Sequence, residues 1–326
     1  MIKGKRILVT GAGGFIGSHL ARELLKNDNF VRVVDIKWDD YLKEKYYSEK
    51  LTLDLRDKQN ALKATTSIDY VFNLAANMGG IGFITDVGAD VMYDNVLINA
   101  YMIKASAENK VKRLFFSSSA CIYPTFKQED PSVVALKEED AYPADPDNFY
   151  GWEKLYTEKM MESFKKDYKL EIRMARYHNI YGPEGTYKGG REKSPAALCR
   201  KVAEVADGGQ IEIWGDGKQT RSYCYIDDCV KGTIMLMESD FTEALNIGSD
   251  RLVSIDDLAD IIIKVSGKNI SKNYNLNAPQ GVRGRNSDNT KLRKILRWEP
   301  QISLEQGLSE TYSWINEQVQ EDLARA

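Results

Sequence analysis

Hydrophobic residues in the first third of the chain fall into short runs that alternate with helical patterns. Residues 5–28, "KRILVTGAGGFIGSHLARELLKND", predict a strand, a glycine turn and a helix. Further buried strands are predicted at 30–37, 68–76 and 111–119, and apolar residues recur at helical spacing over 91–110. This alternation predicts an α/β fold with a parallel sheet covered on both faces.

The pattern changes after Pro124. Residues 124–149 hold four of the eight prolines and many acidic residues, which predicts a long loop region. A long helix is predicted over 150–168 and another strand over 170–183. Beyond residue 183 the pattern is less regular, although Ser254 is in position to cap a helix that follows it.

Composition excludes several classes of protein. The chain has 326 residues, a formal net charge of −3 and 29% charged residues, so no global basic field favours nucleic acid or an anionic membrane. No apolar run reaches the roughly 18 residues typical of a membrane span, and the N-terminus does not resemble a secretory signal. Four cysteines without metal-type spacing and two histidines predict free thiols, no metal site and a cytoplasmic protein.

The glycine turn, "TGAGGFIG", predicts a dinucleotide site. Gly11, Gly14 and Gly17 follow a strand and open a helix, which lets the backbone approach a pyrophosphate at a helix N-terminus. Asp35 ends the second strand, where a carboxylate accepts ribose hydroxyls and repels a 2′-phosphate, so NAD is favoured over NADP. The alternatives are a structural glycine turn and a capping aspartate. The cofactor-binding set predicted here is Gly11, Gly14, Phe15, Ile16, Gly17, Asp35, Asp54, Leu55 and Ala75, with Tyr150 and Lys154.

A serine, a tyrosine and a lysine predict hydride chemistry on an alcohol. Tyr150 and Lys154 are four residues apart and share one helix face, and Ser119 ends a predicted strand. An ammonium beside a phenol lowers the pKa of the tyrosine, which can then take a proton from a hydroxyl while hydride leaves. The alternative for the YxxxK pair is a solvated helix face.

Together these segments resemble the extended short-chain dehydrogenase/reductase superfamily, whose members act mostly on nucleotide sugars. The resemblance spans "TGAGGFIG", "NLAA", "SSSACIYP", "YGWEK", "RYHNIYGP", "WGDGKQTRSYCYIDD" and "NIGS". It implies a Rossmann-type NAD-binding domain over mainly 1–182. It also implies a smaller α/β substrate domain over mainly 183–326, with some segments crossing back to the sheet.

The residue at position 121 distinguishes between subgroups of this superfamily. Dehydratases of the superfamily carry an acidic pair that would fall at Ala120 and Cys121, whereas simple 4-epimerases carry an uncharged small residue there. "NLAANMGGIGFI", "ACIYP", "RYHNIYGPEGTYKGGREKSPAALCRK" and "GVRGRNSDN" resemble the GDP-mannose 3,5-epimerase family. That resemblance implies an isomerase in which Tyr150 and Lys154 serve a transient oxidation at C4. Cys121 and Lys188 would form the acid/base pair at C3 and C5.

The same resemblance implies the substrate contacts. Arg221 and Arg283 are candidates for the diphosphate, with Arg285 not excluded. One departure is Asn77, where plant members have aspartate, so a GDP-mannoheptose stays open as substrate, as does inversion at one carbon only. Other open readings are a 4-epimerase, a 4,6-dehydratase and a non-catalytic NAD-binding scaffold. A homodimer through the helices that carry Tyr150 and Asn95 is expected. The full substrate-binding set is Met78, Gly79, Gly80, Asn179, Lys193, Trp214, Gln219, Arg221 and Arg283.

Overall fold

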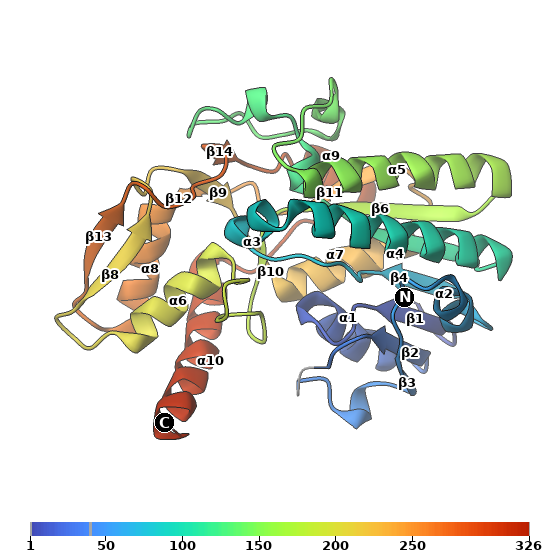
Figure 1. The fold of residues 1–326 in the computed structure, drawn as a ribbon, viewed down its shortest axis with the longest axis horizontal. Helices are drawn as coiled ribbons and strands as arrows, with labels where there is room; N and C mark the ends of the chain where they lie inside the picture. The colour runs from blue at the N-terminus through green and yellow to red at the C-terminus, as the bar shows by residue number, and fades with distance from the viewer. Residues whose placement is uncertain (1, 39–40, 326) are drawn as a thin grey trace.

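A seven-stranded parallel sheet forms the centre of the molecule, as seen in a computed structural model that describes residues 2–38 and 41–325. The strand order is β11-β6-β5-β4-β1-β2-β3, so the chain winds outward in both directions from β1 and β4 (Figure 1). This is the doubly wound α/β arrangement that the sequence predicts. The strands are β1 (Arg6–Thr10), β2 (Phe30–Asp35), β3 (Glu49–Thr52), β4 (Tyr70–Asn73), β5 (Arg113–Ser119), β6 (Glu171–Tyr177) and β11 (Ala244–Ile247).

Helices cover both faces of this sheet, because its strands are apolar on both sides. One face carries α2 (Lys58–Thr65), α4 (Gly88–Glu108) and α5 (Phe149–Tyr168), which pack against one another (Figure 1). The other face carries α1 (Phe15–Leu25) and α7 (Ile226–Glu238), which also pack together. Separate hydrophobic clusters fill the two interfaces.

A smaller mixed region follows residue 183. Its strands are paired as β8 (Gln210–Trp214) with β13 (Ser271–Asn275), and as β12 (Leu252–Ser254), β9 (Thr220–Ser222) and β14 (Gly284–Arg285). Two short strands, β7 (Ile180–Tyr181) and β10 (Cys224–Tyr225), connect this region to the main sheet. Its helices are α6 (Ser194–Glu204), α8 (Ile255–Ser266) and α10 (Leu304–Arg325), whereas α9 (Thr290–Leu296) packs against α7 and β11 of the main sheet.

The chain crosses between these two regions. β11 and α7 lie well after residue 183, yet β11 pairs with β6 and completes the main sheet. The predicted loop 124–149 holds only short 3-10 turns, η3 (Thr125–Lys127) and η4 (Glu138–Ala141), and η2 (Ala120–Ile122) precedes it. Between β4 and α4 lies the short helix α3 (Ile81–Asp86), and η1 (Glu44–Tyr46) precedes β3.

Two predicted helix starts have the expected capping geometry. The Ser254 hydroxyl accepts a bond from the Asp257 amide at 2.9 Å, which confirms the capped start of α8. The Asn148 side chain accepts a bond from the Gly151 amide at 2.8 Å and so fixes the first turn of α5. Since Tyr150 stands in that turn, the cap also holds the tyrosine.

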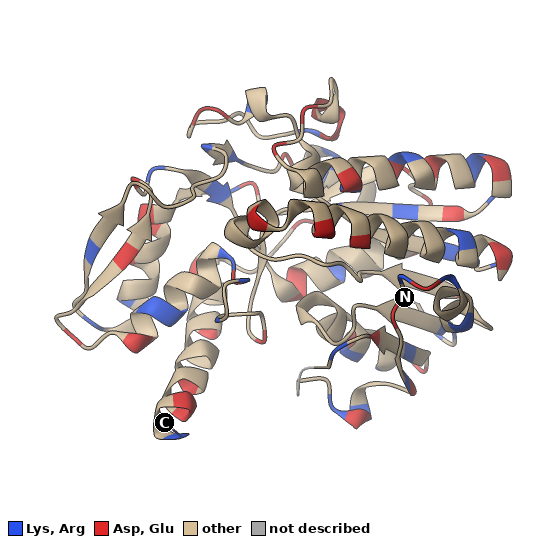
Figure 2. Cartoon of the chain, in the orientation of Figure 1, with Lys and Arg blue, Asp and Glu red and all other residues tan. Residues whose placement is uncertain are grey.

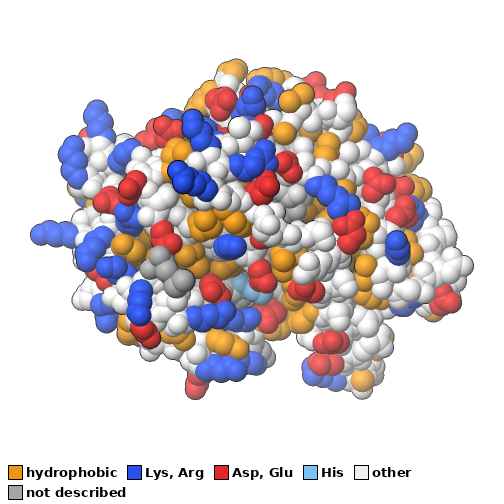
Figure 3. All heavy atoms as spheres, turned by 180° about the vertical axis from the view of Figure 1, so that it is seen from behind, with side chains coloured by type: hydrophobic (Ala, Val, Ile, Leu, Met, Phe, Trp, Pro, Cys, Tyr) orange, Lys and Arg blue, Asp and Glu red, His pale blue; other side chains and the backbone are white. Residues whose placement is uncertain are grey.

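Charged side chains are scattered over the molecule without a field of one sign. Lys, Arg, Asp and Glu alternate along the exposed faces of the helices (Figure 2). On the opposite face of the molecule acidic and basic groups are again interspersed with apolar ones (Figure 3). Within the described residues, no helix combines the length and apolar character needed to cross a membrane.

Candidate functional site

The glycine turn after β1 is shaped by close backbone approaches. Gly11 has a φ of +67°, which favours glycine, and a Cβ on Gly17 would lie 2.2 Å from the Gly11 carbonyl oxygen. Gly14 begins α1 with no side-chain cap, so the first amides of the helix remain available to an anion. The turn therefore fits a dinucleotide pyrophosphate.

Asp35 stands beside that turn at the end of β2. Its carboxylate accepts bonds from the Gly13 amide at 3.0 Å and the Ile36 amide at 2.7 Å. It is therefore held at the edge where a ribose would lie. Gly13 was missing from the sequence-based set, although the motif contains it.

The other predicted cofactor residues follow β3 and β4. Arg56 donates to Asp54 from its backbone amide and its guanidinium, and this hydrogen bonding lowers the pKa of Asp54. The Leu55 side chain is buried in the hydrophobic core. The Ala75 amide donates to the Thr10 hydroxyl at 3.1 Å, next to the glycine turn. No contact here tests the cofactor roles, which stay predictions.

Tyr150, Lys154 and Ser119 come together at the carboxyl end of the sheet. Tyr150 and Lys154 are buried, and the Lys154 amine lies 5.4 Å from the centre of the Tyr150 ring. Burial raises the pKa of Tyr150 well above its usual value, and a hydrogen bond with Ser119 opposes this shift. Desolvation therefore dominates the pKa of Tyr150. Glu153 and Cys121 add to the rise in this pKa, and the lowering by Lys154 that the sequence predicts is not seen.

A cleft of about 280 Å³ opens beside Tyr150, between the main sheet and the smaller region. Both Ser119 and Cys121 line it, as does the "NMGG" loop that follows β4. Of the predicted substrate residues, the cleft contains Met78, Gly79, Gly80, Asn179, Lys193, Trp214, Gln219 and Arg221, and it also contains Arg285.

Cys121 is paired with an arginine in this cleft. The buried Arg285 guanidinium donates to the Cys121 sulfur at 3.3 Å. Gln128 and Asp147 hold the other nitrogens of Arg285, at 2.5 and 3.4 Å. Arg285 thus contacts the thiol directly, an arrangement that spacing along the chain does not reveal.

The two candidate lysines of the "YKGGREK" loop lie in different places. Lys188 is outside the cleft, where its exposed amine pairs with the Asp322 carboxylate of α10. Lys193 lines the cleft at the start of α6, and burial of its amine lowers its pKa while Cys121 opposes that shift. Of these two lysines, Lys193 lines the cleft that contains Cys121, and Lys188 does not.

The candidate phosphate-binding arginines also differ. Arg221 lines the cleft, and among the described residues it donates to the carbonyl groups of Thr220 and Val282. Burial, together with repulsion from Arg285, lowers the pKa of Arg221 to about 10. Arg283 does not line the cleft and instead pairs with both oxygens of Asp216 at 3.0 Å. Arg221 thus has a side free for an anion, whereas Arg283 must leave Asp216 to reach one.

Two acceptor atoms in the lining of the cleft lack a hydrogen-bond partner among the described residues. Glu192 Oε2 and Gln219 Oε1 are buried and have no hydrogen-bond partner, and both residues line the cleft. Buried acceptors of this kind suit a ligand that brings N–H donors. Sequence reasoning missed Glu192, whose only signal is its place beside Lys193.

His178 precedes Asn179 in the chain and is a core residue. Its ring is fully buried, shares a hydrogen bond with Asn246, and burial lowers its pKa to about 3. Cys199, Cys224 and Cys229 are likewise buried and free, as small core residues are.

Comparison with known proteins identifies the family. A sequence model described as "NAD dependent epimerase/dehydratase family" matches residues 7–248. The chain belongs to this family. Members of the NAD-dependent epimerase/dehydratase family use NAD, which agrees with the predicted cofactor.

Curated relatives and solved structures refine the likeness. The chain is 47% identical over 98% of its length to GDP-mannose 3,5-epimerase of Arabidopsis thaliana, of which 84% is covered. It is 49% identical over 97% of its length to GDP-mannose 3,5-epimerase 1 of Oryza sativa subsp. indica, of which 83% is covered. UDP-glucose 4-epimerase of Thermotoga maritima, solved with UDP-glucose, superposes with a TM-score of 0.87 at 28% identity, covering 96% and 99% of the two chains. UDP-glucuronic acid 4-epimerase of Bacillus cereus, solved with NAD, gives a TM-score of 0.81 at 27% identity, covering 96% and 99%.

Proposed function

We propose that this protein is an NAD-dependent isomerase that inverts GDP-mannose, or a close GDP-sugar, at C3 and C5. The observation that carries the proposal is that Cys121 and Lys193 line one cleft together with Tyr150. A thiol and an amine at an oxidation site are what deprotonation and reprotonation of carbon require. Relatives that are 47% and 49% identical carry the name GDP-mannose 3,5-epimerase.

The chemistry begins at Tyr150. Tyr150, assisted by Lys154 and Ser119, accepts the proton of the sugar 4-hydroxyl. NAD+, when bound, supplies the acceptor for the C4 hydride and later returns it. In this scheme the glycine turn would hold the pyrophosphate and Asp35 the adjoining ribose of the dinucleotide.

Oxidation at C4 then allows Cys121 and Lys193 to exchange protons at C3 and C5. A ketone at C4 acidifies the hydrogens on C3 and C5, since each carbanion is stabilised as an enolate. Cys121 removes or returns a proton on one face of the sugar and Lys193 acts on the other. Arg285 holds the sulfur of Cys121 by a hydrogen bond, and this contact makes it a weaker candidate for the diphosphate.

The ends of the cleft fit the two parts of a nucleotide. Arg221, joined by Arg283 if it leaves Asp216, suits the diphosphate. Asn179 lies nearby, where its side chain donates to the Ser222 carbonyl. Glu192 and Gln219 offer acceptors to the N–H groups of guanine, with Trp214 beside them. Met78, Gly79 and Gly80 leave room for the sugar ring to turn.

A 4-epimerase is the second candidate, favoured by the fold likeness to two sugar 4-epimerases. It needs Tyr150 and Lys154 but gives no task to Cys121 and Lys193. Solvent exchange separates the two functions, because C3 and C5 exchange protons with water only in a 3,5-epimerase.

The test is incubation with GDP-mannose, and separately with GDP-mannoheptose, in deuterated water with NMR detection of the sugar protons. We expect deuterium at C3 and C5 together with new sugar isomers. Exchange at one carbon would narrow the function to a single inversion. Inversion at C4 without exchange would support the 4-epimerase, and no exchange with either sugar would refute the GDP-mannose assignment.

We further propose the setting in which the protein works. Residues 1–182 mainly hold NAD and 183–326 mainly hold substrate, with β11 and α7 returning to the sheet. The free thiols fit a reducing, cytoplasmic location. A homodimer forms through α4 and α5, whose exposed aromatic side chains are Tyr93, Phe149, Trp152, Tyr156 and Tyr168.

A further inference from the structure

A buried carboxylate, that of Glu153, lies beside Lys154 of the YxxxK pair. Glu153 has a side chain that is 0% exposed, and one of its oxygens lies 3.7 Å from the Lys154 amine, whose side chain is 1% exposed. Buried charges are rare unless they are paired, because removing an ion from water is costly. The mechanism above gives Glu153 no task.

Neutral amides from α4 hold this carboxylate in place. Asn95 donates to one Glu153 oxygen at 3.0 Å, and Asn99 donates to the other at 3.3 Å. Asn95 also accepts from the Asn77 amide at 2.6 Å, in the loop that carries Met78. Asn99 in turn accepts from Asn73 at the end of β4 at 3.0 Å. Glu153 is thus fixed from two directions, which leaves it little freedom to turn away from Lys154.

We propose that Glu153 is a positioning residue for the proposed reaction, the buried counter-ion that holds the Lys154 ammonium beside Tyr150. This inference rests on the proposed function for its catalytic consequence but not for the ion pair itself. The Lys154 amine also lies 4.7 Å from the centre of the Phe116 ring. A carboxylate and two aromatic rings therefore surround this buried amine.

The electrostatics of the pair agree with this role. Burial lowers the pKa of Lys154, and the Glu153 carboxylate opposes that shift. Burial raises the pKa of Glu153, and Lys154 with the two asparagines opposes it. The other titratable groups acting on the pair are Tyr150 and Cys121, whereas α4 presents only amides to it. Without Glu153, the lysine would lose its proton at a lower pH.

The test compares Glu153→Gln with Glu158→Gln in the full chain. Glu158 is a matched control, since it is buried on the same helix four residues after Lys154, but its carboxylate pairs with Arg176 at 2.7 Å and does not act on the pKa of Lys154. The readout is the dissociation constant of NADH at pH 6 and pH 9, from fluorescence titration. We expect E153Q to bind NADH like the wild type at pH 6 and about tenfold more weakly at pH 9, because the neutral amine no longer attracts the anionic cofactor. E158Q should follow the wild type at both values, even if it melts earlier.

Two further variants guard the interpretation. Glu153→Asp keeps the charge and should retain the wild-type pH dependence, also where E153Q does not fold. In a Lys154→Met background, E153Q should have no additional effect on NADH binding. Equal pH dependence in E153Q and wild type, or the same change in E158Q, would overturn the proposal. If NADH binding behaves as expected while GDP-mannose shows no exchange, the proposed function fails and the ion pair stands.

Discussion

Lys188 and Lys193 are five residues apart in the chain, yet of the two only Lys193 lines the cleft. A general base can remove a proton from a substrate carbon only if its side chain lies within reach of that proton. Lys188 pairs instead with Asp322 on α10, where it helps to anchor the loop.

Replacing each lysine by methionine separates these roles. We expect K193M to lose deuterium exchange at C3 or C5 by about 100-fold or more, as removal of a general acid/base does. K188M should keep exchange within a few-fold of the wild type. The measurement is NMR of GDP-mannose in deuterated water. Loss of deuterium exchange in K188M but not in K193M would show that Lys188, and not Lys193, is the acid/base residue.

Cys121 differs from the other cysteines in accessibility. It is half-buried in the cleft, whereas Cys199, Cys224 and Cys229 are fully buried. We expect iodoacetamide to modify Cys121 at least about tenfold faster than the others, because thiol reactivity follows exposure and nearby cations. Mass spectrometry of tryptic peptides gives the rates, and GDP should slow only the reaction of Cys121. Modification spread evenly over the four thiols would contradict the site.

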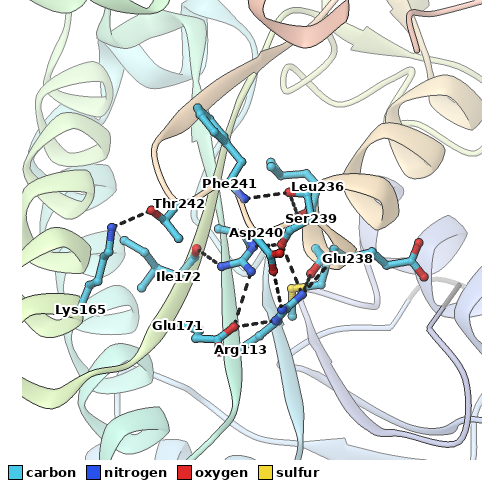
Figure 4. A network of polar contacts seen from close by, with 12 residues as sticks. Arg113, Lys165, Glu171, Ile172, Leu236, Glu238, Ser239, Asp240, Phe241 and Thr242 are labelled. Atoms are coloured by element: carbon cyan, nitrogen blue, oxygen red, sulfur yellow. Dashed lines mark hydrogen bonds and ion pairs between the residues drawn. The ribbon is translucent and has the colours of Figure 1, made fainter. Parts of the chain in front are cut away.

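Among the elements, α7 has an unusual C-terminal cap built from two neighbouring strands. Arg113 of β5 donates to the Met237 and Glu238 carbonyls at 2.8 and 3.0 Å, and Arg173 of β6 donates to the Ser239 carbonyl at 2.8 Å (Figure 4). The last carbonyl groups of a helix need such donors, and its dipole favours cations there. The two arginines therefore join α7 to the sheet at the edge opposite the site.

Removing this cap should affect stability and leave chemistry intact. We expect Arg113→Met to lower the free energy of unfolding by about 1–3 kcal/mol, because buried carbonyl groups lose charged donors. Lys165→Met, which removes an exposed contact to Thr242 on the same surface, should cost less than about 0.5 kcal/mol. Urea unfolding measures both, and equal losses in the two variants would show that the cap contributes nothing.

The sequence predicted elements well where periodicity was strong. The strands β1, β2, β4 and β5 and the Ser254 cap lie where the sequence placed them, because each carries a clear local signal. The sequence did not predict β3, whose four residues form no apolar run. It did not predict the short strands after residue 183, since segments of two or three residues such as β10 and β14 carry no period. Nor could it separate Lys188 from Lys193, because their difference arises from contacts with α10 and α6.

The whole molecule brings distant segments to one edge. The cleft needs Tyr150 from α5, Cys121 after β5, Lys193 before α6 and Arg285 of β14, which no single stretch supplies. The loop before α6 is held to α10 by Lys188 and by Tyr187, whose ring packs edge-on against Trp314 at 5.5 Å. Residue roles in this cleft could be proposed from sequence, but their pairing with Arg285 and Asp322 needed the folded chain.

Oligomeric state is the last property that belongs to the molecule as a whole. Trp152 and Tyr156 are one turn apart on α5, 41% and 54% exposed, and Tyr93 on α4 is 67% exposed. Exposed aromatic side chains gathered on two packed helices are typical of an interface. We expect Tyr156→Glu to shift the protein from the mass of two chains to that of one in sedimentation equilibrium. Leu323→Glu, at a side chain 61% exposed on α10, should leave the mass unchanged, and a wild-type protein with the mass of one chain would refute the dimer.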